Sequence, residues 1–177
     1  MNYDDGPARR APIGLAKSGD KAAFELIMGP YVKTLYHYIR LRVGDSRDIQ
    51  DITQEIMLAC WQGLDSFRED SSLSTWIIGI ARRKISDFYR RARPELNLID
   101  DDLPAPDGAD DLIEALDVRQ AVKRLPLPER EMVFLIFSAR LSYQEVAETL
   151  GIPTGTVKSR MSSVKSKLRS YLETKEE

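Results

Sequence analysis

Residues 141–172 read LSYQEVAETLGIPTGTVKSRMSSVKSKLRSYL, and this stretch predicts two helices joined by a tight turn. Ser142 followed by Glu145 matches a capping box, in which each side chain accepts a hydrogen bond from a backbone N–H that the first helical turn leaves unpaired. Gly151 stands where a left-handed residue would end the first helix, and Pro153 suits the turn and the start of the second. The stretch therefore predicts a helix-turn-helix.

The second of these helices has two different faces. Val157, Met161, Val164 and Leu168 recur at steps of four, three and four, which predicts one buried stripe. Between residues 154 and 172 the helix carries lysines and arginines and no acid, as a helix that enters a groove lined by phosphates requires. An ordinary amphipathic pair with a solvated basic face is the other interpretation. The agreement of cap, turn and charge favours DNA binding.

Composition limits the function classes. The 177 residues suffice for one ordinary domain or two small helical ones, and the net charge of −2 means that nucleic-acid binding must come from segregated patches. Cys60 and His37 are the only residues of their types, which excludes an intrachain disulfide and a zinc site built from several such ligands. We find no nucleophile paired with a base and no glycine-rich phosphate loop, and we expect no catalytic residue, metal or cofactor.

No apolar run has the length of a membrane span, and the amino terminus lacks the pattern of a signal peptide, so we expect a cytoplasmic protein. Residues 1–17 contain glycines and prolines without an apolar period and are expected to form a mobile arm. A first helical domain is expected over 18–93. Its first helix, capped by Asp20, should be interrupted at Gly29-Pro30 before it continues to Val43.

The next expected helix, about 47–63, is apolar on one side through Ile49, Ile52, Ile56 and Cys60. Another side is polar. Such a face is usually only solvated, and the alternative is that it binds a partner. The residues that would do so are Asp48, Asp51, Gln54 and Glu55.

A polar loop over 67–75 has serines placed to cap a helix that runs to about Arg91 and becomes basic along its length. Part of this charge can serve to complement the helix dipole. Trp76, Phe88 and Tyr89 nevertheless stand near the cations, and rings beside cations suit unpaired bases.

Residues 94–111 are rich in proline and aspartate, and no lysine or arginine lies between Arg93 and Arg119. We expect a flexible acidic linker there. A second, four-helix domain should occupy 112–177. Pro128 suits the first turn of one of its helices, and Met132, Val133, Leu135, Ile136 and Phe137 should form the core beneath the helix-turn-helix.

Three segments resemble one protein family. Residues 141–153 and 155–160 are similar to the DNA-binding region of bacterial extracytoplasmic-function (ECF) sigma factors. Residues 51–55 with Trp61 look like the segment by which sigma factors dock on the clamp helices of core RNA polymerase. Residues 74–82 look like the region that captures and melts the upstream-ten promoter element. The resemblance implies an all-α fold of two small domains, region 2 over 18–93 and region 4 over 112–177.

The resemblance also implies sites. The polar face over 48–55 would bind core polymerase, and a flipped base would enter a pocket made partly by residues 67–73. The residues implied at the upstream-ten element are Ser71, Ser72, Trp76, Arg82, Arg83, Lys84, Tyr89, Arg90 and Arg91. Those implied at the upstream-thirty-five element are Thr156, Lys158, Ser159, Arg160, Ser162, Ser163 and Lys165.

Two departures from the family pattern affect base preference. Arg83 stands where the family commonly has asparagine, which favours a phosphate contact there, and Ser162 and Ser163 replace residues that are often basic or aromatic. The DNA sequence that is read is therefore not transferable from the family. The acidic linker would thread through the polymerase toward its active centre, or serve as a plain solvated tether.

The implied partners are core RNA polymerase, promoter DNA and an anti-sigma factor, often membrane-bound, that would hold the chain at the inner membrane face until a signal arrives. Apart from these partners we expect a monomer without a small-molecule substrate. The alternative is a dimeric helix-turn-helix repressor or activator that is not a polymerase subunit. A response regulator would need an α/β receiver, and residues 20–92 show helical periods instead.

Overall fold

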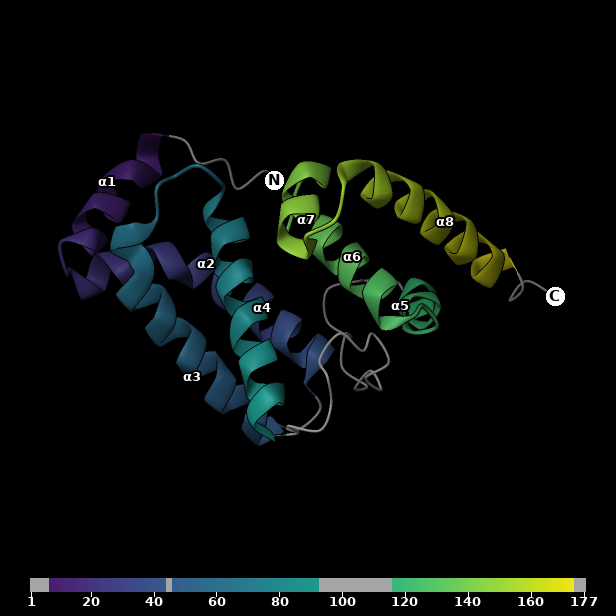
Figure 1. The fold of residues 1–177 in the computed structure, drawn as a ribbon, viewed down its shortest axis with the longest axis horizontal. Coiled ribbons are helices and arrows are strands. Elements are labelled where there is room, and N and C mark those ends of the chain that lie inside the picture. The colour runs from purple at the N-terminus through teal and green to yellow at the C-terminus, as the bar shows by residue number, and fades with distance from the viewer. Residues whose placement is uncertain (1–6, 44–45, 93–115, 174–177) are drawn as a thin grey trace.

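The computed structural model describes residues 7–43, 46–92 and 116–173, and within these ranges it contains helices and no strand. Figure 1 shows two helical units side by side. The first comprises α1 (Pro7–Lys17), α2 (Lys21–Arg42), α3 (Ser46–Gly63), the 3-10 helix η1 (Leu64–Ser66) and α4 (Leu73–Ala92). The second comprises α5 (Leu116–Lys123), α6 (Leu127–Phe137), α7 (Tyr143–Leu150) and α8 (Thr154–Glu173). The all-α prediction is confirmed, and the expected linker over 94–111 lies outside the described residues.

Helix α1 contradicts the expectation of a mobile arm for residues 7–17, and the first six residues of that expected arm lie outside the described residues. It packs against α2, it buries Ile13 and Ala16, and the Lys17 ammonium donates a 2.6 Å hydrogen bond to the carbonyl of Phe67. The chain reverses at Gly19, whose φ of +94° is a conformation that glycine adopts without strain. Ile13 and Ala16 are two apolar residues at a single helical spacing. One such pair is too weak a pattern to predict a helix from the sequence.

Helix α2 corrects a second expectation, because it runs without interruption through Gly29 and Pro30. Asp20 caps it as predicted, accepting a 3.0 Å hydrogen bond from the backbone N–H of Ala23. Proline removes one backbone hydrogen bond from a helix, and it usually kinks or breaks it. Here the residues on both sides of Pro30, Met28 and Tyr31, are buried, so packing holds the helix together across this position.

The second unit contains the predicted helix-turn-helix. The capping box of Ser142 and Glu145 is present at the start of α7, and Gly151 ends α7 with a φ of +68°. Val157, Met161 and Val164 of α8 are buried, as the stripe predicted.

Phe137 contradicts the expected core, because its side chain is 54% exposed. It is the last residue of α6 and lies outside, while Met132 and Leu135 fill the inner side of the helix.

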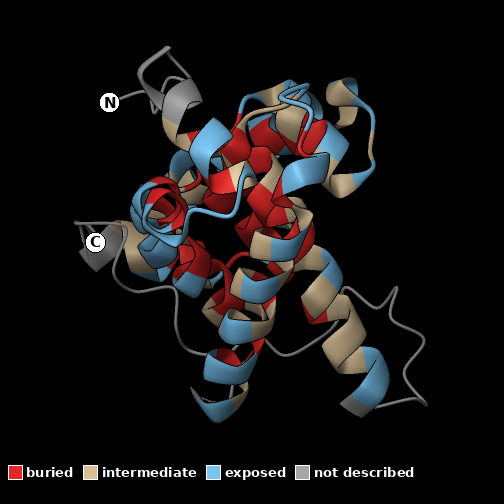
Figure 2. Cartoon of the chain, turned by 90° about the vertical axis from the view of Figure 1, so that its left-hand side faces the viewer, coloured by how far each residue is buried: buried red, intermediate tan, exposed pale blue. Residues whose placement is uncertain are grey.

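The two units share buried surface, as Figure 2 shows by the red segments that run through the middle of the molecule. Helix α4 of the first unit lies against α7 of the second. Among the described helices, none is both long and apolar enough to cross a membrane. Nor do the described ranges contain a cluster of histidine, cysteine and acidic side chains that could hold a metal ion.

Candidate nucleic-acid and polymerase interface

The outer face of α8 displays the residues predicted to read DNA. Because Val157, Met161 and Val164 fix the inner side, the opposite side projects away from α6 and α7. Figure 1 shows α8 along the edge of the molecule that is remote from α4. Thr156 is half-buried in the first turn, and the exposed members of this face are Lys158, Ser159, Arg160, Ser162, Ser163 and Lys165. None of the seven predicted residues lies in the buried stripe, and together they extend around the rest of the α8 circumference.

Not every cation of α8 belongs to that face. The Lys167 ammonium lies 2.5 Å from a carboxylate oxygen of Glu129 in α6, and both side chains are at least partly buried. Arg124, the residue that follows α5, lies over the ring of Tyr171, 5.7 Å from its centroid. These contacts attach the C-terminal half of α8 to its own unit. The sequence, read as a simple basic run, does not separate such structural cations from those that face solvent.

The loop before α4 positions Ser71, Ser72 and Trp76. The Ser72 hydroxyl accepts a 3.2 Å hydrogen bond from the backbone N–H of Thr75, which caps α4 as predicted. The Trp76 ring packs on Phe67, with centroids 5.3 Å apart, and a Cβ built at Gly63 would lie 3.4 Å from it. Trp76, in the first turn of α4, is half-buried, and its ring holds this end of α4 against Phe67 and Gly63.

The basic residues follow along α4. Arg83, Arg90 and Arg91 are exposed, and Arg82 and Lys84 are partly exposed. Arg90 forms a 2.8 Å ion pair with Asp87 one turn earlier.

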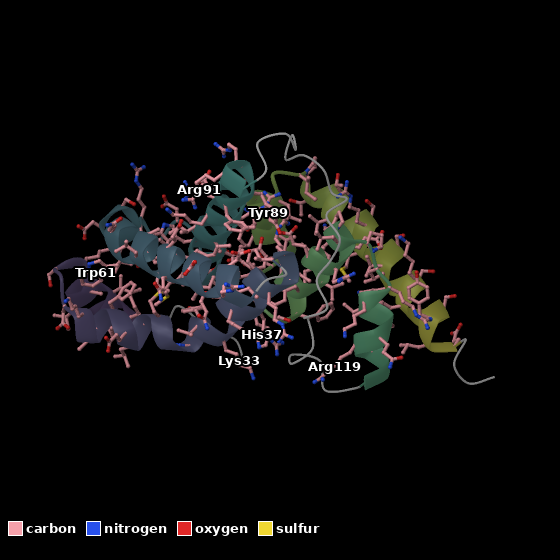
Figure 3. The ribbon with its side chains drawn as sticks, turned by 90° about the horizontal axis from the view of Figure 1, so that it is seen from below. Lys33, His37, Trp61, Tyr89, Arg91 and Arg119 are labelled. Atoms are coloured by element: carbon pink, nitrogen blue, oxygen red, sulfur yellow. The ribbon has the colours of Figure 1, made fainter. Side chains whose placement is uncertain are left out.

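Tyr89 is tied to the neighbouring helix. Its hydroxyl donates a hydrogen bond to the carbonyl of Arg42 at the end of α2. Figure 3 shows Tyr89 and Arg91 toward one end of α4, whereas Trp61 lies at the far end of α3.

Glu55 joins the two predicted surfaces of the first unit. It belongs to the face of α3 predicted to bind polymerase, yet its carboxylate accepts hydrogen bonds of 3.1 Å from Arg91 and lies 3.9 Å from the Lys84 ammonium. Asp51 and Gln54 on the same face are exposed, and Asp48 is partly exposed. The sequence did not indicate that a residue of one site would hold two cations of the other.

A cleft of about 590 Å³ separates part of α4 from α7. Its lining comprises Arg42, Ser71, Thr75, Gly79, Arg82, Arg83, Ser86, Glu148 and Thr149. Three arginines and four hydroxyl-bearing residues thus line one cavity, in which Glu148 is the only acid of the lining. The arrangement suits a ligand rich in oxygen acceptors, such as a nucleic-acid backbone.

Beside the cleft, α4 and its loop donate hydrogen bonds directly to the second unit. The hydroxyls of Ser72 and Thr75 reach the Glu145 carboxylate at 2.5 and 2.8 Å. Arg82 donates to the carbonyl of Thr149 at 2.8 Å, near the negative end of the α7 dipole. Sequence reasoning missed these contacts because the partners lie about 70 residues apart and no local pattern links them.

A second cluster surrounds the buried carboxylate of Glu131 in α6. Its Oε1 atom accepts a 2.5 Å hydrogen bond from the Tyr38 hydroxyl, and its Oε2 atom pairs with Arg42 at 2.6 Å. Arg82 lies 4.0 Å from Oε1. Burial and the Glu131 charge hold the pKa of Tyr38 well above its ordinary value, so this hydroxyl stays a donor.

Two further groups are shifted by their surroundings. Burial of Glu145 raises its pKa, but the hydrogen bonds from Ser72, Ser142 and Thr75 outweigh burial, and the pKa of this carboxyl lies below its ordinary value. Glu145 is therefore ionised at neutral pH. Burial raises the pKa of the Cys60 thiol to about 12, which leaves it protonated and packed in the core.

The sequence matches two family models, "Sigma-70 region 2" over residues 27–95 and "Sigma-70, region 4" over residues 115–168. The ECF RNA polymerase sigma factor SigM of Mycobacterium tuberculosis is 31% identical over 156 residues, which span 88% of this chain and 80% of SigM. The ECF RNA polymerase sigma factor SigW of Bacillus subtilis is 28% identical, with 90% and 94% of the two chains covered.

Solved structures show the same architecture. CnrH, solved in complex with the cytosolic domain of CnrY, matches with a TM-score of 0.66 and 25% identity over 94% of this chain and 98% of that chain. The sigma factor RpoE of Bartonella quintana, solved with the anti-sigma factor NepR, shares the fold at a TM-score of 0.65 and 22% identity, with 85% and 96% covered. Both matches span the two helical units. The chain therefore belongs to the ECF sigma factors of RNA polymerase.

Proposed function

We propose that this chain directs core RNA polymerase to specific promoters by reading two separate DNA elements, one with each helical unit. The proposal rests on the different surfaces of the two units. The second unit has an acid-free outer face on α8, and the first has a serine-containing loop followed by a basic helix. The catalytic groups for RNA synthesis belong to the polymerase, and the chain supplies recognition.

The outer face of α8 reads the upstream-thirty-five element. A helix of this kind enters the major groove with its N-terminal residues on base edges, and Lys158, Ser159 and Arg160 are exposed in its first two turns. Lysine and arginine can contact guanine edges or phosphates, and serine can meet either. Ser162, Ser163 and Lys165 extend the same face. Thr156 is placed at the first turn, where it can contact the backbone.

The loop before α4 and the basic face of α4 bind the upstream-ten element. Ser71 and Ser72 supply hydroxyl donors, while Arg82 and Arg83 line the cleft of about 590 Å³ beside them. Trp76 and Tyr89 offer ring surface for unstacked bases, and Lys84, Arg90 and Arg91 supply charge for the backbone. Melted DNA exposes the bases and phosphates that such a surface binds.

The polar face of α3 docks on the polymerase. Asp51 and Gln54 are exposed, so their side chains are accessible to a partner. Asp48 extends this face by one turn. Glu55 contributes indirectly, because its carboxylate holds Arg91 and Lys84. The proposed docking site on α3 and the proposed DNA-binding site on α4 are therefore adjacent, on two helices that pack against each other.

An anti-sigma factor is the partner expected to control the chain. CnrH, which aligns over 94% of this chain, was solved in complex with the cytosolic domain of CnrY, and RpoE was solved with an anti-sigma factor. A protein of this class would cover the polymerase-docking and DNA-reading faces. The chain then acts in the cytoplasm, and a membrane-anchored anti-sigma factor would hold it at the inner membrane face.

The test is transcription in vitro by bacterial core polymerase on fragmented genomic DNA, with and without this protein, with start sites mapped. We expect new starts that share two spaced upstream elements. The proposal fails if no new starts appear and the protein does not comigrate with core. Footprints of the protein alone on palindromic sites would then indicate a dimeric repressor or activator.

A further inference from the structure

Helix α1 reaches the start of the loop before α4 through the side chain of Lys17. The Lys17 ammonium donates a 2.6 Å hydrogen bond to the backbone carbonyl of Phe67 and lies over the Phe67 ring, 5.9 Å from its centroid. A cation at this distance is attracted to the face of an aromatic ring. One side chain of α1 therefore holds both the backbone and the ring of Phe67.

The position of Lys17 is fixed by the packing of α1. Ile13 and Ala16 of this helix are buried, and the turn that follows is closed by a 3.1 Å hydrogen bond from the backbone N–H of Asp20 to the carbonyl of Leu15. A lysine side chain loses much rotamer entropy when it is held against one carbonyl. The ordered backbone beneath Lys17 keeps that loss confined to the side chain.

Phe67 connects Lys17 to a ring that is proposed to meet an unstacked base. Phe67 is 4% exposed, and its ring packs on Trp76 with centroids 5.3 Å apart. Trp76 also lies close to Gly63, where a Cβ would be 3.4 Å from the indole. Phe67 therefore limits where the Trp76 ring can lie, and Lys17 limits where Phe67 can lie.

Trp76 forms part of the wall of a pocket of about 300 Å³. The lining also includes Gly63, Ser66, Ile80 and Arg83. Ser66 directly precedes Phe67 in the chain. A shift of Phe67 would therefore move two parts of the wall, the segment at Ser66 and the ring of Trp76. Lys17 is not part of the lining, so it acts on the pocket through Phe67.

The loop between η1 and α4 is held at both of its ends. Phe67 accepts the hydrogen bond from Lys17 at the start, and Ser72 caps α4 at the end. Residues 68–70 between them are exposed, and Glu69 has a φ of +60°, which residues other than glycine rarely adopt. A strained loop keeps its shape only where surrounding contacts hold it. The bond from Lys17 is one of these contacts.

We propose that Lys17 is a positioning residue for the upstream-ten element: it holds Phe67 and thereby fixes the loop and the Trp76 ring in the shape that receives an unstacked base. This inference rests on the proposed function. A pre-formed pocket avoids the cost of ordering at the moment when the base leaves the stack, and its fixed walls distinguish one base from another. Loss of the ammonium should therefore slow melting and weaken base discrimination, while the initial binding of double-stranded promoter stays unchanged.

Three variants distinguish the Lys17 ammonium from net charge. Lys17→Met keeps an apolar side chain and removes both the donor and the charge. Lys17→Arg supplies a cation that can again donate to the Phe67 carbonyl and lie over its ring. Lys21→Met removes one positive charge from an exposed position at the start of α2 and is the matched control.

The first readout is promoter melting by holoenzyme reconstituted from core polymerase and each variant. The promoter is one found by start mapping, with 2-aminopurine in place of a nontemplate-strand adenine of the upstream-ten element, and the fluorescence of this base rises when it leaves the stack. Titration with holoenzyme separates the affinity of the initial complex from the rate of melting.

We expect Lys17→Met to melt this promoter roughly tenfold more slowly at unchanged initial affinity. A hydrogen bond to a charged group contributes about a factor of ten to an equilibrium constant, and here the bond holds the loop in its binding shape. Lys17→Arg should melt the promoter at close to the parent rate, and so should Lys21→Met.

The second readout is the ratio of the melting rates on the mapped promoter and on promoters with one substituted base in the upstream-ten element. Partial unfolding of a destabilised variant lowers the active concentration on every promoter equally, so it leaves this ratio unchanged. A loosened pocket lowers the ratio. We expect a lower ratio for Lys17→Met at one or more positions of the element, and the parent ratio for Lys17→Arg.

An unchanged rate and ratio in Lys17→Met overturn the proposal, and the sigma function then stands without it. Equal slowing on every promoter also overturns it, because Lys17 would then serve only the stability of the fold. The same loss in Lys21→Met would assign the effect to net charge, with the same consequence. A parent holoenzyme that melts no promoter would instead remove the proposed function, and this inference with it.

Discussion

The hydroxyl of Tyr38 in α2 donates a 2.5 Å hydrogen bond to the carboxylate of Glu131 in α6, 93 positions further along the chain. Both side chains are buried. Tyr38→Phe keeps the ring and removes the donor, which leaves a buried charged acceptor with one partner fewer, so we expect a loss of about 1–3 kcal/mol in unfolding free energy by urea denaturation.

Tyr36→Phe is the matched control for that measurement, because Tyr36 is on the same helix and 39% exposed. Its unfolding free energy should stay within about 0.5 kcal/mol of the parent value. Equal stability of both variants would show that the Tyr38–Glu131 bond does not stabilise the folded chain.

The two glycines at the helix-turn-helix should respond in opposite directions to alanine. Gly151 has a φ of +68°, and Gly155 lies within α8, while a Cβ would meet nothing within 4 Å at either position. Gly151→Ala should destabilise the chain by about 1–2 kcal/mol through backbone strain alone. Gly155→Ala should stabilise it by up to about 1 kcal/mol through helix propensity. Thermal unfolding measures both, and a shift of the same sign in the two variants would refute the assigned conformations.

Charge reversal on α3 tests polymerase docking. Asp51→Lys should weaken the affinity for core polymerase, measured by fluorescence anisotropy of the labelled protein, and should leave thermal stability unchanged because Asp51 is exposed. Asp65→Lys makes the same change on η1, outside that face, and should bind core normally. Glu55 is a poorer choice for this test, since its substitution would also release Arg91 and Lys84. Normal binding by Asp51→Lys would remove Asp51 from the docking site.

Substitutions of Arg160 and Lys167 distinguish a cation that contacts DNA from one that stabilises the fold on the same helix. Arg160→Ala should cost about 1–3 kcal/mol in binding of the upstream-thirty-five element and relax specificity at one step, if the guanidinium contacts a base. Lys167→Ala should leave that affinity nearly unchanged, because its ammonium pairs with Glu129. Filter-binding or anisotropy titrations against single-base variants measure both. A uniform loss over all variants for Arg160→Ala would assign the residue to phosphate instead.

Cys60 should be inert in the folded protein. Burial raises the pKa of its thiol to about 12, so at pH 8 almost none is thiolate, and the side chain is also inaccessible. We expect a thiol reagent such as dithionitrobenzoate to react with Cys60 only as fast as the chain unfolds. Rapid labelling in native buffer, at the rate of a small-molecule thiol, would contradict the buried placement.

The fold could be predicted from the sequence where several neighbouring residues formed one local pattern. The capping box at Ser142, the left-handed glycine at 151 and the buried stripe of α8 were each predicted from a few residues, because their causes lie within one or two helical turns. The unbroken course of α2 through Pro30 and the helix α1 were not, because packing against distant residues decides both.

The candidate sites divide in the same way. The outer face of α8 could be read from periodicity and charge, since one helix supplies it. The contacts of Glu145 with Ser72 and of Glu55 with Arg91 could not, because side chains 73 and 36 positions apart meet only after folding. The burial of Phe137 was predicted wrongly. An apolar residue at the end of a core helix can point inward or outward, and the neighbouring sequence does not show which.

The central claim is that one chain reads two separated DNA elements on behalf of core polymerase. Single-round transcription from a mapped start tests it most directly, with each element scrambled in turn and with the parent chain or Arg160→Ala. We predict transcripts only when this protein is added, their loss when either element is scrambled, and a reduction by Arg160→Ala that disappears when the upstream-thirty-five element is already scrambled. Transcription that is independent of the protein, or insensitive to both elements, would contradict the claim.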